Sequence, residues 1–319
     1  MMERRKFLKV ATLGALAYAC PYDGRGEEKP QKFKIGMAAT TWLATEQSTA
    51  MYWKAVEAIS QLGIGATEAD NSNAHLDSAY GADPAAFVTR SRGIGVQLEG
   101  VYQALPLHER KSWGAIMTKI RSDGKFLKAA NAKYIALGWA LPAAVGGKPY
   151  QRTAADVQQV IRAADEVGRI SSEEYGIIVA LHAERDIPKD VVLEILDGTN
   201  PKYLKFCADV GHLAGMGLDP LQTVKRYASR LAVSHWKDFD PKLSSPSYLG
   251  GKATGDFVEL GQGTVDFRGL AAFYRQIGFD GWVMVELDHY HRPSIMESVR
   301  QMKGFVTDEL KLQFVPLQH

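Results

Sequence analysis

Short apolar runs alternate with longer stretches of helical periodicity along most of the chain. In the longer stretches apolar residues recur three or four positions apart, as in Met51-Ala55-Ile59-Leu62 and Val157-Ile161-Ala164-Val167, which predicts amphipathic helices. The short runs have the length and apolar character of buried strands. They comprise residues 34–38, 64–68, 96–102, 134–139, 176–182, 203–209, 231–235 and 281–286.

Eight units of strand followed by helix predict an α/β fold, a single-domain (β/α)8 TIM barrel over residues 33–319. A doubly wound sheet is the alternative, but no glycine-rich dinucleotide-binding motif follows the first predicted strand. A length of 319 residues fits one such barrel with additional segments. The stretch 239–263, rich in Ser, Gly and Pro, is predicted to be a long irregular loop after the seventh strand.

The N-terminus has the pattern of an export signal. Two arginines, Arg4 and Arg5, precede an apolar run over residues 10–19 that is too short to span a bilayer and ends in small residues. We therefore predict a twin-arginine-like signal peptide over residues 1–19, a linker over 20–32 and an exported, periplasmic or membrane-anchored protein. The alternative is an amphipathic surface helix. Because Cys20 directly follows the predicted cleavage site, a lipid anchor at Cys20 is a further expectation.

Charge argues against a nucleic-acid partner. The chain has 38 basic and 36 acidic residues, a net charge of +2. Four of the basic residues and one acidic residue lie in the first 19 positions, so the rest of the chain holds 34 and 35 and has a net charge of −1. No basic footprint for nucleic acid remains, and a small molecule is the expected partner. Cys207, the second of the two cysteines, is interpreted as a small buried apolar residue.

Polar side chains end the last four predicted strands. They are His182 and Glu184 on the fifth strand, Asp209 and His212 on the sixth, His235, Lys237 and Asp238 on the seventh, and Glu286 on the eighth. Reactive groups of TIM barrels come from the carboxyl ends of different strands. Singly, each residue has an ordinary structural explanation as a hydrogen-bonded histidine or a helix cap. Together they predict one divalent metal ion, Mn²⁺, Mg²⁺, Co²⁺ or Zn²⁺, in an open N/O coordination sphere.

These motifs resemble the sugar phosphate isomerase/epimerase (xylose-isomerase-like) family. The resemblance is carried by Asp209-x-x-His212, by His235-x-Lys237-Asp238, by the segment Leu-Gly-Gln-Gly-Thr-Val-Asp-Phe at 260–267 and by Glu286. The resemblance implies metal binding by Asp209, His235 and Glu286. It also implies that His212 contacts the substrate or the metal and that Lys237 faces substrate oxygens.

The fifth strand departs from that family. Many members have a glutamate there as ligand and acid/base, whereas this chain has His182, with Glu184 two positions later. Alternation along a strand places both side chains on one side, so either residue could bind the metal while the other assists. We predict His182 as the ligand and count His182, Glu184 and Glu286 as candidate catalytic groups. A symmetric two-glutamate epimerase mechanism does not fit this strand.

Three residues at other strand ends are candidates for substrate binding. Glu68 ends the second strand, and Trp42 and Tyr102 follow the first and third, where aromatic rings could stack on a sugar. Helix capping for Glu68 and core packing for the aromatics are the alternatives. The glycines around Gln262 could bind phosphate through backbone N–H groups, although turn formation is the favoured interpretation.

The predicted function is a metal-dependent isomerase, epimerase, hydratase or lyase that converts a sugar or keto-sugar through a metal-stabilised enediolate. Protonation at another carbon isomerises the sugar, protonation on the opposite face epimerises it, and loss or addition at the β-carbon gives hydratase or lyase chemistry. The sequence leaves these outcomes open. The alternatives are an endonuclease-IV-like phosphodiesterase, which needs histidines on strands two and three, and a non-catalytic sugar-binding barrel.

Overall fold

The computed structural model describes residues 29–43, 48–70, 83–140, 144–145, 148–149, 152–246 and 252–318. The predicted signal peptide, Cys20 and most of the predicted linker lie outside these residues, so their assignments stay predictions. No helix among the described residues has the length and apolar character needed to cross a membrane.

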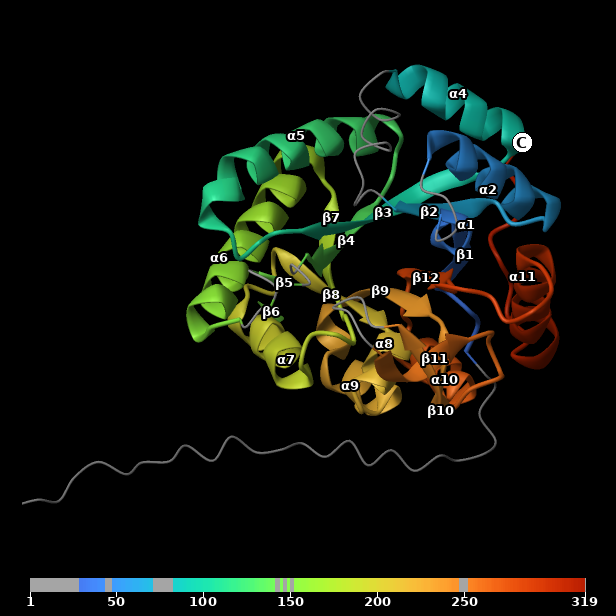
Figure 1. Cartoon of the computed structure of the whole chain (residues 1–319). Helices are drawn as coiled ribbons and strands as arrows, with labels where there is room; N and C mark the ends of the chain where they lie inside the picture. The colour runs from blue at the N-terminus through green and yellow to red at the C-terminus, as the bar shows by residue number, and fades with distance from the viewer. Residues whose placement is uncertain are drawn as a thin grey trace, which may run out of the picture.

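Eight parallel strands close into a barrel, which confirms the predicted TIM-barrel fold (Figure 1). Their order around the barrel is β1-β12-β9-β8-β7-β4-β3-β2, and β1 closes the ring by pairing with both β12 and β2. The strands are β1 (Lys34–Ala38), β2 (Ala66–Asp70), β3 (Gln97–Leu105), β4 (Tyr134–Trp139), β7 (Ile178–His182), β8 (Leu204–Asp209), β9 (Leu231–Trp236) and β12 (Trp282–Val285).

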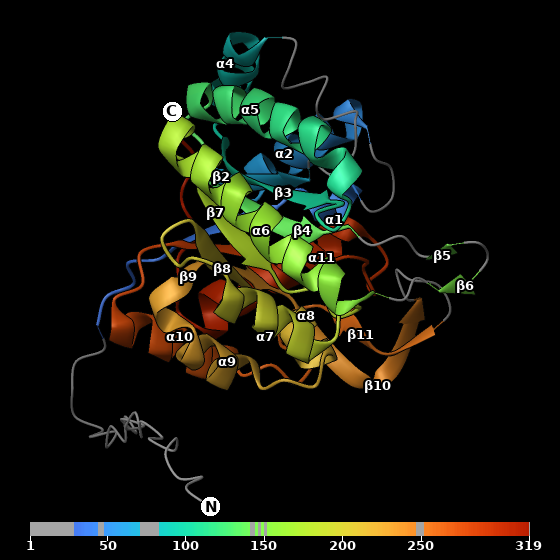
Figure 2. The same ribbon diagram turned by 90° about the vertical axis from the view of Figure 1, so that its left-hand side faces the viewer.

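Helices surround the strands in both views of the molecule (Figures 1 and 2). They are α1 (Thr40–Leu43), α2 (Thr49–Gln61), α4 (Pro84–Ile94), α5 (Trp113–Ala129), α6 (Ala154–Ile170), α7 (Lys189–Gly198), α8 (Val210–Gly215), α9 (Pro220–Arg226), α10 (Phe267–Ile277) and α11 (Ile295–Gly304). Side chains cap several of them: α6 begins with a reciprocal capping box between Thr153 and Asp156.

The strands bury apolar side chains in two layers. Ile135 and Leu137 of β4 belong to the large core between the strands and the helices. Their neighbours Tyr134 and Ala136 belong to a smaller cluster inside the barrel, which also contains Cys207. Strand alternation explains this division, because successive side chains point to opposite faces. Several small residues in the inner cluster leave space for long polar side chains at the carboxyl ends of the strands.

The structure corrects the predicted loop at 239–263. Most of it forms an antiparallel hairpin of β10 (Asp238–Pro246) and β11 (Lys252–Val258), which pair from Asp238↔Val258 to Pro246↔Lys252. The sequence has many turn-forming residues there, yet Phe239 and Phe257 pair across the hairpin and are buried. The hairpin lies at the same end of the barrel as α1 and α8, which follow the carboxyl ends of β1 and β8 (Figure 2). A smaller hairpin joins β5 (Ala144–Val145) and β6 (Lys148–Pro149).

Candidate active site

The structure brings together the polar residues predicted at the ends of the last four barrel strands. His182 ends β7, Asp209 ends β8, His235 lies near the end of β9, and Glu286 directly follows β12. The backbone N–H of Glu286 donates to Trp236 O at 3.0 Å, which continues the strand pairing to this residue. All four side chains are buried. These are the residues that the sequence predicted as metal ligands.

Each histidine of this group contacts a carboxylate with its outer nitrogen. His182 Nδ1 lies 2.8 Å from Glu184 Oε1, and His235 Nε2 lies 3.0 Å from Glu68 Oε2. Metal-bound histidines commonly donate their second N–H to a carboxylate in this way, which fixes the ring orientation and the tautomer. With these tautomers, the lone pairs of His182 Nε2 and His235 Nδ1 face inward, where the two atoms are 3.1 Å apart.

Two carboxylate oxygens complete this inward-facing set. Asp209 Oδ1 caps α8 by accepting the backbone N–H of His212 at 2.9 Å, which leaves Oδ2 facing the histidines. Asp209 Oδ2 lies 3.3 Å from His182 Nε2 and 3.8 Å from His235 Nδ1. Glu286 Oε2 lies 2.9 Å from His235 Nδ1. Asp209 Oδ2 and Glu286 Oε2 are buried and accept no hydrogen bond of good geometry from any described residue.

These four atoms fit a single divalent ion. Ligands bound at 2.0–2.1 Å in a tetrahedral site are separated by about 3.3 Å. Four of the six separations among these atoms, which include all three that join the two histidines and Asp209, range from 2.9 to 3.8 Å. Two imidazole nitrogens and two carboxylate oxygens suit Zn²⁺, Co²⁺ or Mn²⁺. An ion bound here would also coordinate the two buried carboxylate oxygens that accept no hydrogen bond of good geometry.

Lys237 lies beside this set and is fully buried. Its Nζ is 3.1 Å from Glu286 Oε1, 2.7 Å from Asp288 Oδ1 and 3.3 Å from Asp209 Oδ2. Gly211 leaves room for it, because a Cβ at that position would lie 2.3 Å from Lys237 Cγ. The Phe257 ring of β11 covers the ammonium at 4.9 Å. The three carboxylates therefore surround a cation that water reaches poorly.

His212 lies close to both Lys237 and His182, and the family resemblance implied that it contacts the substrate or the metal. The backbone N–H of Arg185 donates to His212 Nδ1 at 2.8 Å, so a neutral ring carries its proton on Nε2. His212 Nε2 lies 3.5 Å from Lys237 Nζ. Burial lowers the pKa of His212 and the Lys237 cation lowers it further, although the nearby carboxylates oppose this shift. His212 is therefore a neutral hydrogen-bond donor at neutral pH.

Charges within the site move the other pKa values strongly. Burial lowers the pKa of His182, but Glu184 and Asp209 outweigh burial and raise the pKa to about 10. The metal-free ring is therefore protonated at neutral pH, and an ion that binds His182 Nε2 displaces the proton on that nitrogen. Burial also disfavours the charged form of Glu184, yet the charge and the hydrogen bond of His182 outweigh burial and lower the pKa of Glu184 to about 2. For Glu286, Lys237 and His235 likewise overcome burial and hold the pKa well below its usual value. The carboxylates are thus ionised and ready to bind a cation.

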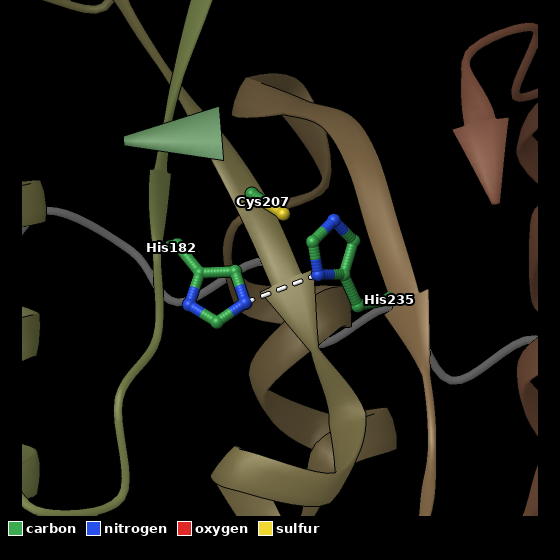
Figure 3. A group of neighbouring side chains, drawn as sticks. All are labelled: His182, Cys207 and His235. Atoms are coloured by element: carbon green, nitrogen blue, oxygen red, sulfur yellow. Dashed lines mark hydrogen bonds between the residues drawn. The ribbon is translucent and has the colours of Figure 1, made fainter. Parts of the chain in front are cut away.

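Cys207 also lies within this group, which the sequence interpretation missed. The structure confirms that Cys207 is buried, but its sulfur and one nitrogen each of His182 and His235 all lie within 4.8 Å of one another. Figure 3 shows the sulfur directed toward the His235 ring. Cys207 precedes Asp209 by two positions on β8, so both side chains point into the barrel, with the thiol one layer deeper. The spacing of two positions between Cys207 and Asp209 on one predicted strand was the signal in the sequence that both side chains lie on the same face.

The remaining predicted residues divide between contacts with the histidines and core packing. Tyr102 Oη donates to Glu184 Oε1 at 2.6 Å, and its ring lies edge-on to the His182 ring. Glu68 contacts His235, as described above. Trp42 is buried in the core around α1 and α2, as the packing alternative expects. Sequence reasoning missed Asp288 and Phe257, since one lies in the segment after β12 and the other in the predicted loop.

The glycines near Gln262 serve the turn. Gly261 has a φ of +83°, a left-handed conformation that favours glycine. The backbone N–H groups of Gly261 and Gly263 donate to Asp238 Oδ2 at 3.0 and 2.8 Å. Asp238 thus uses the N–H groups considered for phosphate binding to fix the turn that follows the hairpin. This agrees with the favoured interpretation of these glycines.

The fold and these motifs agree with comparisons to known proteins. The sequence model of the family described as Xylose isomerase-like TIM barrel matches residues 56–305. The chain belongs to this family. An inosose dehydratase of Lacticaseibacillus casei is 29% identical over 147 residues, which cover 44% of this chain and 47% of that protein. The chain therefore matches about half the length of that relative.

A longer match and several solved structures extend the comparison across the family. An inosose dehydratase of Geobacillus kaustophilus (strain HTA426) is 21% identical over 283 residues, 82% of this chain and 89% of that protein. A D-allulose 3-epimerase from Methylomonas sp. has a TM-score of 0.66 at 16% identity and covers 89% of this chain and 100% of its own. The IOLI protein with a bound zinc atom has a TM-score of 0.65 at 17% identity and covers 88% and 98%. At these identities the structures show a shared fold.

Proposed function

We propose that this protein is a metal-dependent dehydratase that removes water from a polyhydroxy ketone, such as a keto-sugar or an inosose. The observation that supports this proposal most is the convergence of four inward-facing ligand atoms beside the buried ammonium of Lys237. Similarity to inosose dehydratases supports the reaction class. Membership of the xylose isomerase-like family supports a substrate that carries a carbonyl and neighbouring hydroxyls.

His182, Asp209, His235 and Glu286 would hold the ion. When bound, a divalent ion polarises a carbonyl and a neighbouring hydroxyl oxygen and stabilises the negative charge that develops on them. The protein contributes orientation, because Glu184 and Glu68 fix the two imidazoles from behind. Glu184 is therefore proposed as a positioning residue.

Glu286 is the proposed proton acceptor. Its carboxylate lies at the barrel mouth between His235 and Lys237, with Oε1 3.1 Å from Lys237 Nζ. It takes the proton from the carbon next to the carbonyl, and the electrons of that C–H bond form the enediolate. Contact with the Lys237 ammonium weakens this base, but the same positive charge stabilises the enediolate that forms beside it.

Lys237 is the proposed proton donor. As the enediolate electrons re-form the carbonyl and a new carbon–carbon double bond, the bond from the β-carbon to its hydroxyl breaks, and the hydroxyl leaves as water with a proton from Nζ. His212 can donate a hydrogen bond from Nε2 to the same hydroxyl. Glu286 then carries one extra proton and Lys237 lacks one. Transfer across the 3.1 Å contact restores both groups.

The arrangement fits elimination better than epimerisation between two carboxylates. Epimerisation of that kind needs a second available carboxylate on the opposite face of the substrate. β7 ends in an imidazole, and Glu184 Oε1 already accepts the hydroxyl of Tyr102 and contacts His182. The phosphodiesterase alternative needs histidines from β2 and β3, and neither Ala66–Asp70 nor Gln97–Leu105 contains one.

An activity screen tests the proposal. Metal-loaded protein is incubated separately with inososes, free keto-sugars and 3-keto-glycosides. We expect one substrate class to lose one water, detected by mass spectrometry and by the ultraviolet absorbance of the conjugated ketone. Asp209→Ala is the matched inactive control. Inversion at carbon with incorporation of solvent deuterium and no water loss would show an epimerase instead. No turnover of any of these ketones would overturn the proposed substrate class.

A further inference from the structure

Three side chains outside the barrel centre form a second group of potential metal ligands. Asp256 lies on β11, and His289 and His291 lie in the segment that follows β12. His289 Nε2 is 2.7 Å from Asp256 Oδ1, and His291 Nε2 is 3.4 Å from Asp256 Oδ2. One ligand atom from each residue lies within 4.8 Å of the other two. The imidazole rings are 5.2 Å apart and strongly inclined to each other.

Hydrogen bonds behind these side chains hold the group in place. Asp256 is buried, and its Oδ1 accepts the backbone N–H of Phe257 at 2.8 Å. Glu259 Oε1 accepts the backbone N–H of His291 at 2.9 Å and the Ser298 hydroxyl at 2.5 Å. The imidazoles stay accessible, with 42% of the His289 side chain and 37% of the His291 side chain exposed. A small ion can therefore reach ligands whose supports are already formed.

The ligand types select the class of ion. Two imidazole nitrogens and one carboxylate oxygen suit Zn²⁺, Co²⁺, Ni²⁺ or Cu²⁺, whereas Mg²⁺ and Ca²⁺ prefer oxygen ligands alone. Exposure of the imidazoles lets water complete the coordination. His291 Nε2 also lies 2.9 Å from the carbonyl oxygen of Phe257, so metal binding exchanges this hydrogen bond for a metal bond. The competing explanation is a cluster held by ion pairs and hydrogen bonds alone.

We propose that Asp256, His289 and His291 bind a second divalent transition-metal ion, which fastens the β10–β11 hairpin to the segment after β12. Both elements reach Lys237: Asp288 of the segment contacts its ammonium, and Phe257 of the hairpin covers it. The second ion thereby holds together the two elements that contact Lys237 in the candidate active site. This proposal does not depend on the reaction proposed above.

Metal stoichiometry tests the second site. Purified full-length protein is loaded with Zn²⁺, dialysed against metal-free buffer and analysed by inductively coupled plasma mass spectrometry. We expect two equivalents in the wild type and one in the double variant His289→Gln/His291→Gln. Both side chains are partly exposed, so this variant should fold. Asp209→Ala should also retain one equivalent, which belongs to the second site. His108→Gln is the matched histidine control and should retain two.

Loading with Co²⁺ gives an independent measurement. We expect the visible spectrum of Asp209→Ala to show d–d bands that disappear in the triple variant Asp209→Ala/His289→Gln/His291→Gln. Zn²⁺ should raise the melting temperature of Asp209→Ala and not that of the triple variant. Equal metal content in the wild type and in His289→Gln/His291→Gln would overturn the proposal and leave an ion-paired cluster. This result is independent of whether the barrel centre is catalytic.

Discussion

Glu68 Oε2 lies 3.0 Å from His235 Nε2, and this contact joins the middle of β2 to the end of β9, two strands that are not neighbours in the barrel. Both side chains are fully buried. If the N–H of His235 points to Glu68, the Nδ1 lone pair must point toward His182, Asp209 and Glu286. A residue first considered for substrate binding thus determines which nitrogen of His235 is available to a metal.

Glu68→Gln should weaken metal binding at the barrel centre by roughly 10- to 100-fold, a range typical for loss of a carboxylate behind a metal-bound histidine. The amide can still accept the N–H of His235, but it no longer supplies negative charge. Competition with a chelator measures the affinity, in the His289→Gln/His291→Gln background so that only the barrel centre is observed. Glu57→Gln, at an exposed position of α2, is the control. Unchanged affinity would show that Glu68 does not orient His235.

Variants of Lys237 and Glu286 should separate the two proton transfers. Lys237→Met removes the proposed proton donor, so water loss should fall by about 10² or more, while exchange of the α-proton with solvent deuterium continues. Glu286→Gln should reduce both processes by at least about 10². Mass spectrometry of one reaction mixture follows both. Near-wild-type turnover of Glu286→Gln would move the proton acceptor to His182 or Glu184.

Glu99 should make stability depend on pH. Burial raises its pKa to about 7, although Lys133 and Lys34 oppose the shift. The folded protein therefore keeps this proton between about pH 4.5 and 7 while the unfolded chain loses it, so the free energy of unfolding falls as pH rises through that window. Glu99→Gln should be more stable than wild type at pH 8 by about 2–3 kcal/mol and nearly equal at pH 4.

Urea denaturation of the two proteins at both pH values measures this difference, in which the titration of all other groups cancels. Glu194→Gln, an exposed position on α7, should show no comparable gain. An equal free energy of unfolding for wild type and Glu99→Gln at pH 8 would show that the carboxylate is not destabilised by burial.

Export through a twin-arginine route is a separate prediction, which rests on residues 1–19 of the sequence. Replacing Arg4 and Arg5 together with lysine should leave the precursor uncleaved inside the cell, because that route reads the arginine pair as an address. Cell fractionation with an antibody to the mature chain measures the distribution. Normal export of the double variant would contradict the assignment.

The eight strands were predictable because parallel barrel strands are buried on both faces and stand out as apolar runs. β1 and β4 have the predicted bounds, while β2 lies two residues later and β3 extends to Leu105. The β10–β11 hairpin was missed, since its many Ser, Gly and Pro residues indicate turns. Its pairing depends on contacts such as Phe257 with His212, which only the folded chain brings together.

The sequence predicts which residues form the candidate site, but it does not predict which of them face the metal and which support the ligands. Strand alternation placed His182 and Glu184 on one side but could not show which one faces inward. The answer depends on Tyr102, 82 positions earlier along the chain, whose hydroxyl holds Glu184 behind the imidazole. Asp256, His289 and His291 gave no signal, because a hairpin and a loop bring them together.

The central claim is that one divalent ion is bound by His182, Asp209, His235 and Glu286. Anomalous diffraction at the zinc absorption edge, from crystals of Zn²⁺-loaded protein, tests it most directly. We predict a peak about 2.0–2.2 Å from His182 Nε2, Asp209 Oδ2, His235 Nδ1 and Glu286 Oε2. A barrel centre without a peak, or a zinc ion bound by Glu184 in place of His182, would contradict the account.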